Sequence, residues 1–139
     1  MKEAKDKKGF TLIEIMLVVI IIAALSSMVI PRLVGRSESA KLSITKSDIE
    51  TSIATALKLY ELDNGNFPSS NQGLKALLTK PTTSPIPANW NGPYLEKEPE
   101  DPWGHDYLYL SPGDHRSDYD LSSKGKNVNS DEDDISNWK

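Results

Sequence analysis

The sequence has no cysteine and only two histidines among its 139 residues. Without cysteine the chain has no disulfide framework. His105 and His115 each adjoin an aspartate in or beside a predicted turn, and a zinc site made from them and an aspartate has no recognised spacing. There is also no glycine-rich phosphate loop and no nucleophile elbow. The residue sets that an active site requires are therefore missing, and we do not expect an enzyme.

Positive charge is scarce beyond the first residues. The chain has a net charge of -4, but residues 1–9 carry four lysines against two acidic residues, a charge of +2. The chain from Phe10 onward therefore carries -6. Because nucleic acids attract basic surfaces, we expect no nucleic-acid partner. The length allows one small domain in addition to the apolar N-terminal segment described next.

Residues 12–30 form an apolar run in which Glu14 is the only charged residue. A run of about 19 such residues is long enough for a helix to cross a bilayer. A carboxylate in such a span is unfavourable, which makes Glu14 a functional candidate that needs a partner. Two ordinary interpretations of this run are a plain membrane anchor and a secretory signal cut near Ala24-Leu25-Ser26. The apolar run exceeds the roughly 7–15 residues of ordinary signals, and Glu14 is unusual inside one.

The segment Gly9-Phe10-Thr11-Leu12-Ile13-Glu14 resembles the signal sequence of type IV pilins and type II secretion pseudopilins. The resemblance implies that prepilin peptidase cuts after Gly9 and methylates the new amino terminus at Phe10. It also implies that Glu14 guides assembly by pairing with the amino terminus of a neighbouring subunit. An ammonium and a carboxylate are far less unfavourable in hydrocarbon as a pair than apart. The leader lysines place the N-terminus in the cytoplasm, so the rest of the chain is expected on the outer face of the bacterial inner membrane, as a single-pass protein.

Residues 37–62 have a helical pattern with one apolar face: Leu42, Ile49, Ile53, Ala56, Leu57 and Tyr60. Asn64-Gly65 supplies a natural helix stop. Upstream, Pro31 allows two interpretations that the sequence leaves open. The membrane helix ends there, or one helix continues in the monomer and melts locally near residues 24–31 in the filament.

The chain changes character after Gly65. We expect a short helix at residues 71–78, an irregular proline-rich stretch at residues 80–93, and two strands at residues 107–110 and 119–121. These elements predict an α+β fold in which one long N-terminal helix, half membrane and half amphipathic, packs on a small antiparallel β-sheet with irregular loops. The expected organisation is a leader at residues 1–9, a transmembrane and assembly helix at 10–35, and a periplasmic domain at 36–139.

Further blocks narrow the resemblance. They are residues 62–68, residues 71–74 with Lys80-Pro81, and Asp101-Pro102-Trp103-Gly104 with Tyr107, Tyr109, Pro112 and Gly113. Together they resemble the major pseudopilins of type II secretion over essentially the whole chain. The resemblance implies a homopolymer that forms a short periplasmic filament, with minor pseudopilins, prepilin peptidase and the inner-membrane assembly platform with its ATPase as partners. The alternative is a type IV pilus subunit for adhesion or motility, which is disfavoured because such pilins usually close a C-terminal loop with a disulfide.

The C-terminal segment, residues 123–139, is rich in oxygen ligands. Its alternating asparagines and aspartates start like an EF-hand loop, but Glu132 stands where glycine is required and Trp138 where glutamate is required, so an EF-hand is rejected. Composition alone favours a solvated acidic tail.

The pseudopilin resemblance implies instead that this segment binds calcium (Ca²⁺). Asp134 matches the second ligand aspartate of the family, while the first falls on Asn127, whose neutral oxygen should weaken the site. Asp131 or Asp133 could supply the missing charge, and the main-chain oxygen of Lys124 could complete the shell. We expect the ion to take the place of the missing disulfide.

Overall fold

The computed structural model describes residues 9–139, apart from the side chains of residues 29–34. The predicted leader lies outside this part of the chain, except for Gly9. The chain divides into two units, Met1–Glu38 and Ser39–Lys139.

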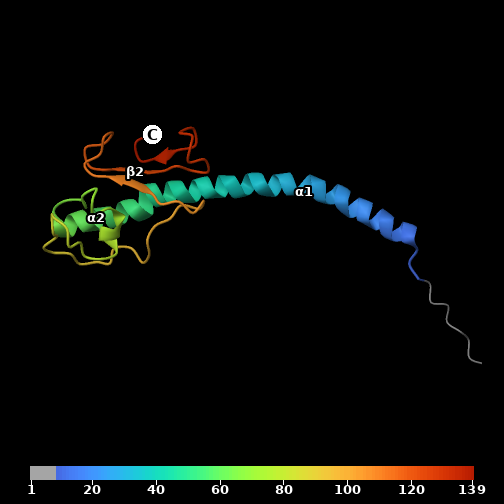
Figure 1. Ribbon diagram of the computed structural model, residues 1–139, viewed down its shortest axis with the longest axis horizontal. Helices are drawn as coiled ribbons and strands as arrows, with labels where there is room; N and C mark the ends of the chain where they lie inside the picture. The colour runs from blue at the N-terminus through green and yellow to red at the C-terminus, as the bar shows by residue number, and fades with distance from the viewer. Residues whose placement is uncertain (1–8) are drawn as a thin grey trace, which may run out of the picture. The chain divides into compact units, whose positions relative to one another are not determined.

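Helix α1 (Leu12–Ser47) begins in the first unit (Figure 1). Every residue from Phe10 to Leu25 is exposed, including the large apolar side chains. Among the residues that the structure describes, no helix is both long and apolar enough to cross a membrane. The helix continues across position 31, so the interpretation in which it ends at Pro31 is wrong for the single chain.

The helical part of the second unit continues from α1 through the π-helical turn η1 (Asp48–Ser52) into α2 (Ile53–Asn64). Helix α2 stops at Gly65, whose φ of 80° is the left-handed conformation that glycine adopts without steric strain. The N–H of Gly65 donates to the carbonyl of Glu61 at 2.7 Å. The stop predicted at Asn64-Gly65 is thus confirmed.

The apolar face of this helical segment is confirmed with one exception. Five of its six predicted members are buried: Ile49, Ile53, Ala56, Leu57 and Tyr60. The prediction that Leu42 is buried was wrong, because its side chain is 44% exposed. In the turns before η1, Thr45 is the fully buried residue instead. The turn η1 is wider than an α-helical turn and shifts the phase of the residues before it, which an α-helical pattern does not anticipate. The Thr45 hydroxyl donates to the Lys41 carbonyl at 2.9 Å, so its burial leaves no unpaired donor.

The sheet is antiparallel with the order β1-β2-β3. Strands β1 (Leu108–Leu110) and β2 (Asp120–Ser123) lie close to the predicted ranges. Strand β3 (Ile135–Ser136) was not predicted, and the predicted helix at residues 71–78 is only the four-residue 3-10 helix η2 (Leu74–Leu77). In the register, Leu110 is opposite Asp120 and Ser123 is opposite Ile135.

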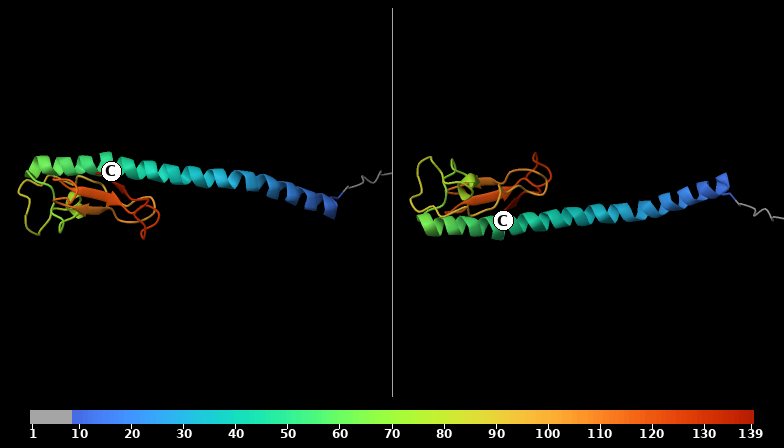
Figure 2. Two further views of the ribbon diagram at one scale, coloured as in Figure 1. Left: turned by 90° about the horizontal axis from the view of Figure 1, so that it is seen from above. Right: turned by 90° about the horizontal axis from the view of Figure 1, so that it is seen from below.

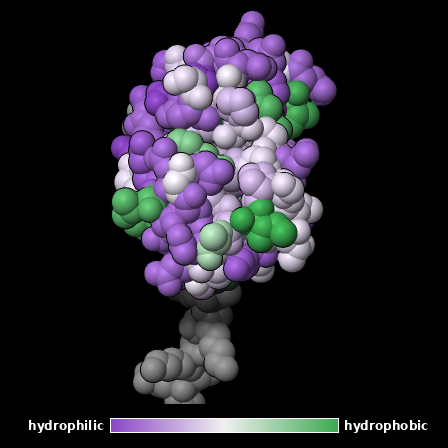
Figure 3. Space-filling view, turned by 90° about the vertical axis from the view of Figure 1, so that its left-hand side faces the viewer, coloured by the Kyte–Doolittle hydropathy of each residue, from purple (hydrophilic) through white to green (hydrophobic). Residues whose placement is uncertain are grey.

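One apolar core joins the helical segment to the sheet. Within the second unit, the sheet lies along one side of the helical segment that ends in α2 (Figures 1 and 2). The buried residues come from the helix, from η2 and from the strands with their flanks: Ile49, Ile53, Ala56, Leu57, Tyr60, Leu74, Ala76, Leu77, Tyr107, Tyr119 and Leu121. Seen from the α2 end, the surface is mostly hydrophilic with small separate hydrophobic patches (Figure 3). Burial of the helical stripe therefore fixes where β2 lies, and with it the loop that follows β2.

Candidate assembly and metal sites

The N-terminal site lies where the chain enters α1. Gly9 and Phe10 are exposed and non-helical, directly before the helix. Thr11 and Glu14 form a reciprocal capping pair: the Thr11 N–H donates to Glu14 Oε2 at 3.4 Å, and the Glu14 N–H donates to Thr11 Oγ1 at 3.3 Å. This arrangement satisfies free amide groups at the start of a helix. The sequence analysis missed it, although Thr11-Leu12-Ile13-Glu14 carries the capping-box signature.

The C-terminal site is the loop between β2 and β3, and a lysine lies at its centre. Lys124 Nζ donates to Asp131 Oδ1 at 2.8 Å and to Asp134 Oδ2 at 2.9 Å. These hydrogen bonds, to Asp131 and then to Asp134, raise the pKa of Lys124 to about 12. The Lys124 hydrogen bond in turn lowers the pKa of Asp131. The side chain of Lys124 therefore engages two of the predicted calcium ligands.

The other two predicted ligands pair with each other. The N–H of Asn127 donates to Asp133 Oδ2 at 2.9 Å, and Asn127 Oδ1 accepts from the N–H of Asn129 at 3.2 Å. Gly125 permits this packing: its φ is +62°, and a Cβ there would lie 2.5 Å from the carbonyl oxygen of Asp133. The structure thus brings the predicted ligands together as two pairs within one loop.

A buried aspartate holds the start of this loop. Asp101 Oδ2 accepts a 2.6 Å hydrogen bond from Ser123 Oγ, and Asp101 Oδ1 accepts from the N–H groups of Trp103 and His105 at 3.0 and 2.8 Å. Ser123 Oγ in turn accepts from the N–H of Gly125 at 3.0 Å. The loop therefore leaves β2 in a fixed direction.

Asn137 and Trp138 hold the end of the loop. The Asn137 side chain accepts from the Leu121 N–H and donates to the Tyr119 carbonyl, both at 3.0 Å, and the Asn137 N–H donates to the Leu121 carbonyl at 3.0 Å. Trp138 stacks on His115 with ring centroids 4.2 Å apart and planes 4° from parallel. The sequence analysis did not predict the structural role of either residue.

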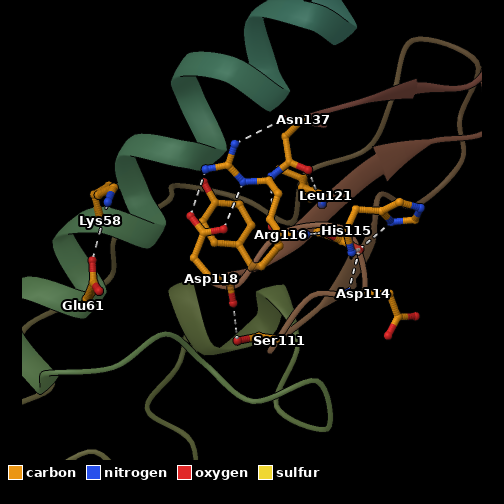
Figure 4. Close-up of polar contacts among 11 residues, drawn as sticks. Lys58, Glu61, Ser111, Asp114, His115, Arg116, Asp118, Leu121 and Asn137 are labelled. Atoms are coloured by element: carbon orange, nitrogen blue, oxygen red, sulfur yellow. Dashed lines mark hydrogen bonds and ion pairs between the residues drawn. The ribbon is translucent and has the colours of Figure 1, made fainter. Parts of the chain in front are cut away.

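The segment before β2 contains charged residues that form hydrogen bonds with each other and with Asn137, directly after β3. Arg116 forms two hydrogen bonds with Asp118, at 2.9 and 3.0 Å, and a weaker one with the Asn137 carbonyl at 3.4 Å (Figure 4). The Arg116 hydrogen bond lowers the pKa of Asp118 to about 2. Burial would raise the pKa of Asp120, but hydrogen bonds from the His115 N–H, the His115 ring and neighbouring N–H groups lower it overall.

Comparison with known proteins decides the family. A family model described as "Type II secretion system (T2SS), protein G" matches residues 32–138. The chain belongs to this family. A second model, the prokaryotic N-terminal methylation motif, matches residues 4–30.

Individual relatives agree with this assignment. The type II secretion system core protein G of Pseudomonas aeruginosa is 48% identical over 140 residues, covering 98% of both chains. The core protein G of Escherichia coli K12 is 44% identical, covering 99% of this chain and 95% of that protein. The crystal structure of the major pseudopilin from the type 2 secretion system of enterohaemorrhagic Escherichia coli has a TM-score of 0.66 and 40% identity, over 78% of this chain and 95% of that chain.

These findings confirm the predicted α+β pseudopilin fold and the interpretation as a major pseudopilin of type II secretion, over the type IV pilus alternative. The family is one of structural subunits that assemble with other pseudopilins and the secretion machinery. Together with the methylation motif, membership implies a membrane-anchored periplasmic subunit.

The loop of this pseudopilin has the donor chemistry that calcium requires. Its candidate ligands are all oxygens, as a hard cation prefers. Asp134 Oδ1 is buried and has no hydrogen-bond partner, which is unfavourable unless a cation or water completes it. Across residues 9–139, however, no three acidic, histidine or cysteine side chains gather closely enough to hold a metal ion. A calcium ion here would therefore depend on main-chain and amide oxygens beside Asp134.

Proposed function

We propose that this chain is made as a precursor, cut between Gly9 and Phe10, methylated on Phe10, and polymerised into the short periplasmic filament of a type II secretion system. Residues 12–30 hold it in the bacterial inner membrane in a single pass, with the domain from residue 36 in the periplasm. Its partners are identical copies, minor pseudopilins, prepilin peptidase and the membrane assembly platform with its ATPase. The observation that carries this proposal is an exposed apolar helix headed by one carboxylate, in a chain that matches the methylation motif.

Glu14 would be the assembly residue. In the single chain its carboxylate is exposed and, among the described residues, accepts one long hydrogen bond, from the Thr11 N–H at 3.4 Å, so it is available to a stronger partner. The amino terminus of a neighbouring subunit, a full positive charge, would be such a partner where both groups lie in hydrocarbon.

Replacing Glu14 tests this role. Glu14→Ala should still be cut and methylated but should give few or no filaments in electron micrographs. Thr11→Ala is the matched control, because it removes the hydroxyl of the capping pair and keeps the carboxylate. If the two variants assemble equally poorly, Glu14 acts through helix capping. Normal filaments from Glu14→Ala would refute the pairing role.

The mass of the mature protein tests the processing step. We expect a chain that starts at Phe10 and carries one added methyl group. A start near Ser27 would instead identify an ordinary signal peptide.

We further propose that the β2–β3 loop binds calcium through Asp134, with Asn127, the main-chain oxygen of Lys124 and either Asp131 or Asp133 as the candidate remaining ligands. The buried, unpaired Asp134 Oδ1 and the close approach of Gly125 to Asp133 support it. A ligand that binds only the folded state stabilises it by mass action. Thermal unfolding should therefore shift upward in calcium relative to a chelator, and no shift at millimolar calcium would refute the site.

A further inference from the structure

Lys124 is placed as a cross-strand partner of the acidic end of the loop. Because Ser123 is opposite Ile135 in the β2–β3 register, Lys124 and Asp134 extend the same register by one position. Side chains directly opposite on antiparallel strands are near enough to interact. The lysine side chain is also partly sheltered, since it is 33% exposed, and the Asp134 side chain is 17% exposed.

The loop needs a positive charge in the absence of a metal. Residues 131–134 are four consecutive acidic residues, Asp131-Glu132-Asp133-Asp134, and like charges at this spacing repel each other. Lys124 supplies the nearest cation that the structure shows bound to them, at 2.8 and 2.9 Å from two of the four carboxylates. Lys126, two residues along, is exposed, and no ion pair from it is seen among the described residues.

We propose that the Lys124 ammonium is a tethered cation that holds the β2–β3 loop closed without calcium, and that calcium must displace it to bind. The second half of this proposal rests on the calcium site proposed above, but the first half does not. The ammonium donates to Asp134 Oδ2, an oxygen of the carboxylate that the metal needs, and Asp134 Oδ1 is left unpaired. A lysine has three donors and one charge, so it can bridge two carboxylates but cannot supply the six to eight contacts of calcium.

Two consequences follow for this chain. Because the lysine neutralises part of the acidic loop, the loop should stay ordered in a chelator. Because calcium has to break two ion pairs that the chain already makes, the affinity for calcium should be lower than the donor set alone would give. Asn127 acts in the same direction, because its neutral side-chain oxygen brings no negative charge that would favour the metal.

The test is thermal unfolding of the full-length chain in detergent, followed by tryptophan fluorescence, in chelator and in calcium. All three tryptophans, Trp90, Trp103 and Trp138, lie in the second unit, so the signal reports on that unit. Lys124→Met removes the ammonium and keeps an apolar stem. Lys124→Arg keeps the charge, and Lys126→Met is the matched control for loss of a neighbouring lysine.

In chelator we expect Lys124→Met to unfold about 2–5 °C below the wild type, as loss of one or two partly exposed ion pairs predicts. Lys124→Arg and Lys126→Met should unfold close to the wild type. In calcium, Lys124→Met should recover, and titration calorimetry should give a Kd about three- to tenfold lower than that of the wild type.

The outcomes separate this proposal from the calcium site itself. If Lys124→Met unfolds with the wild type in chelator, the ammonium does not hold the loop and the proposal is overturned. If calcium binds both chains with the same Kd, the competition is overturned. If neither chain binds calcium but Lys124→Met is destabilised, the proposed metal site fails, and the lysine is supported as the cation of the loop.

Discussion

The two units of this chain use apolar residues in opposite ways. In the first unit, every described residue from Phe10 to Leu25 is exposed, and most of them are large and apolar. In the second unit, Ile49, Ile53, Leu57 and Tyr60 are almost completely buried on one face of the helical segment. Large apolar side chains are therefore exposed on the surface of the first unit and buried in the core of the second.

This difference indicates where each unit obtains its stability. Apolar surface that the chain itself does not bury gains nothing until lipid or another subunit covers it. The first unit is thus expected to depend on its environment, while the second contains the described core and should unfold as a domain. Assembly and folding should then respond to different substitutions.

The largest effect should come from emptying the core. Leu57 is fully buried within the cluster, so Leu57→Ala should destabilise the second unit by about 2–5 kcal/mol, from lost transfer free energy and the cavity that remains. Leu17→Ala, at a site that is 59% exposed, removes the same atoms without making a cavity. Tryptophan fluorescence should show that Leu57→Ala lowers the melting temperature and that Leu17→Ala leaves it unchanged.

The effect of the two substitutions on filament yield should be the opposite of their effect on melting temperature. At a temperature where both variants remain folded, Leu17→Ala should reduce filaments more than Leu57→Ala does. Equal losses of melting temperature in the two variants would contradict the separation of folding from assembly.

The second unit was largely predictable from its sequence, because its elements follow local rules. A helical stripe followed by Asn64-Gly65 specified α2 and its end, and two short runs of tyrosine and leucine on either side of a predicted turn indicated β1 and β2. Leu42 was misplaced because nothing in the local pattern indicates the π-helical turn η1. Strand β3 was missed because two residues are too few to show alternation.

The candidate sites were predictable in composition but not in geometry. The oxygen ligands of the loop could be read from the sequence, but the pairing of Lys124 with Asp134 depends on the register of a strand that was not predicted. Asn137 is similar: its side chain acts as part of the sheet ladder across a separation of 16 residues. Contacts made across such separations depend on the finished fold and leave no local pattern.

A smaller effect should come from opening the second unit at its C-terminal end. Asn137→Ala removes both side-chain hydrogen bonds to β2 and its flank and leaves the Leu121 N–H and the Tyr119 carbonyl unpaired. We expect a loss of about 1–3 kcal/mol, measured by chemical unfolding. Asn129→Ala, an exposed site in the same loop, is the control and should stay within about 0.5 kcal/mol of the wild type. An unchanged Asn137→Ala would mean that β3 does not depend on this side chain.

The smallest effect concerns charge and sharpens the comparison further, since it should touch only the second unit. The Arg116 hydrogen bonds hold the pKa of Asp118 at about 2, below its ordinary value of 3.8. A carboxyl whose pKa is lowered by folding stabilises the folded state fully above its unfolded pKa, and this contribution is lost as the pH falls through the folded value. Asp118→Asn should therefore lower stability by up to about 1 kcal/mol at pH 7, as expected for a partly exposed ion pair.

The difference from the wild type should shrink between pH 4 and pH 2 and vanish below about pH 2, in melting curves recorded across that range. Asp106→Asn, at an exposed carboxylate, is the control. A difference that stays constant down to pH 2 would show that Asp118 stabilises the domain through its shape rather than its charge.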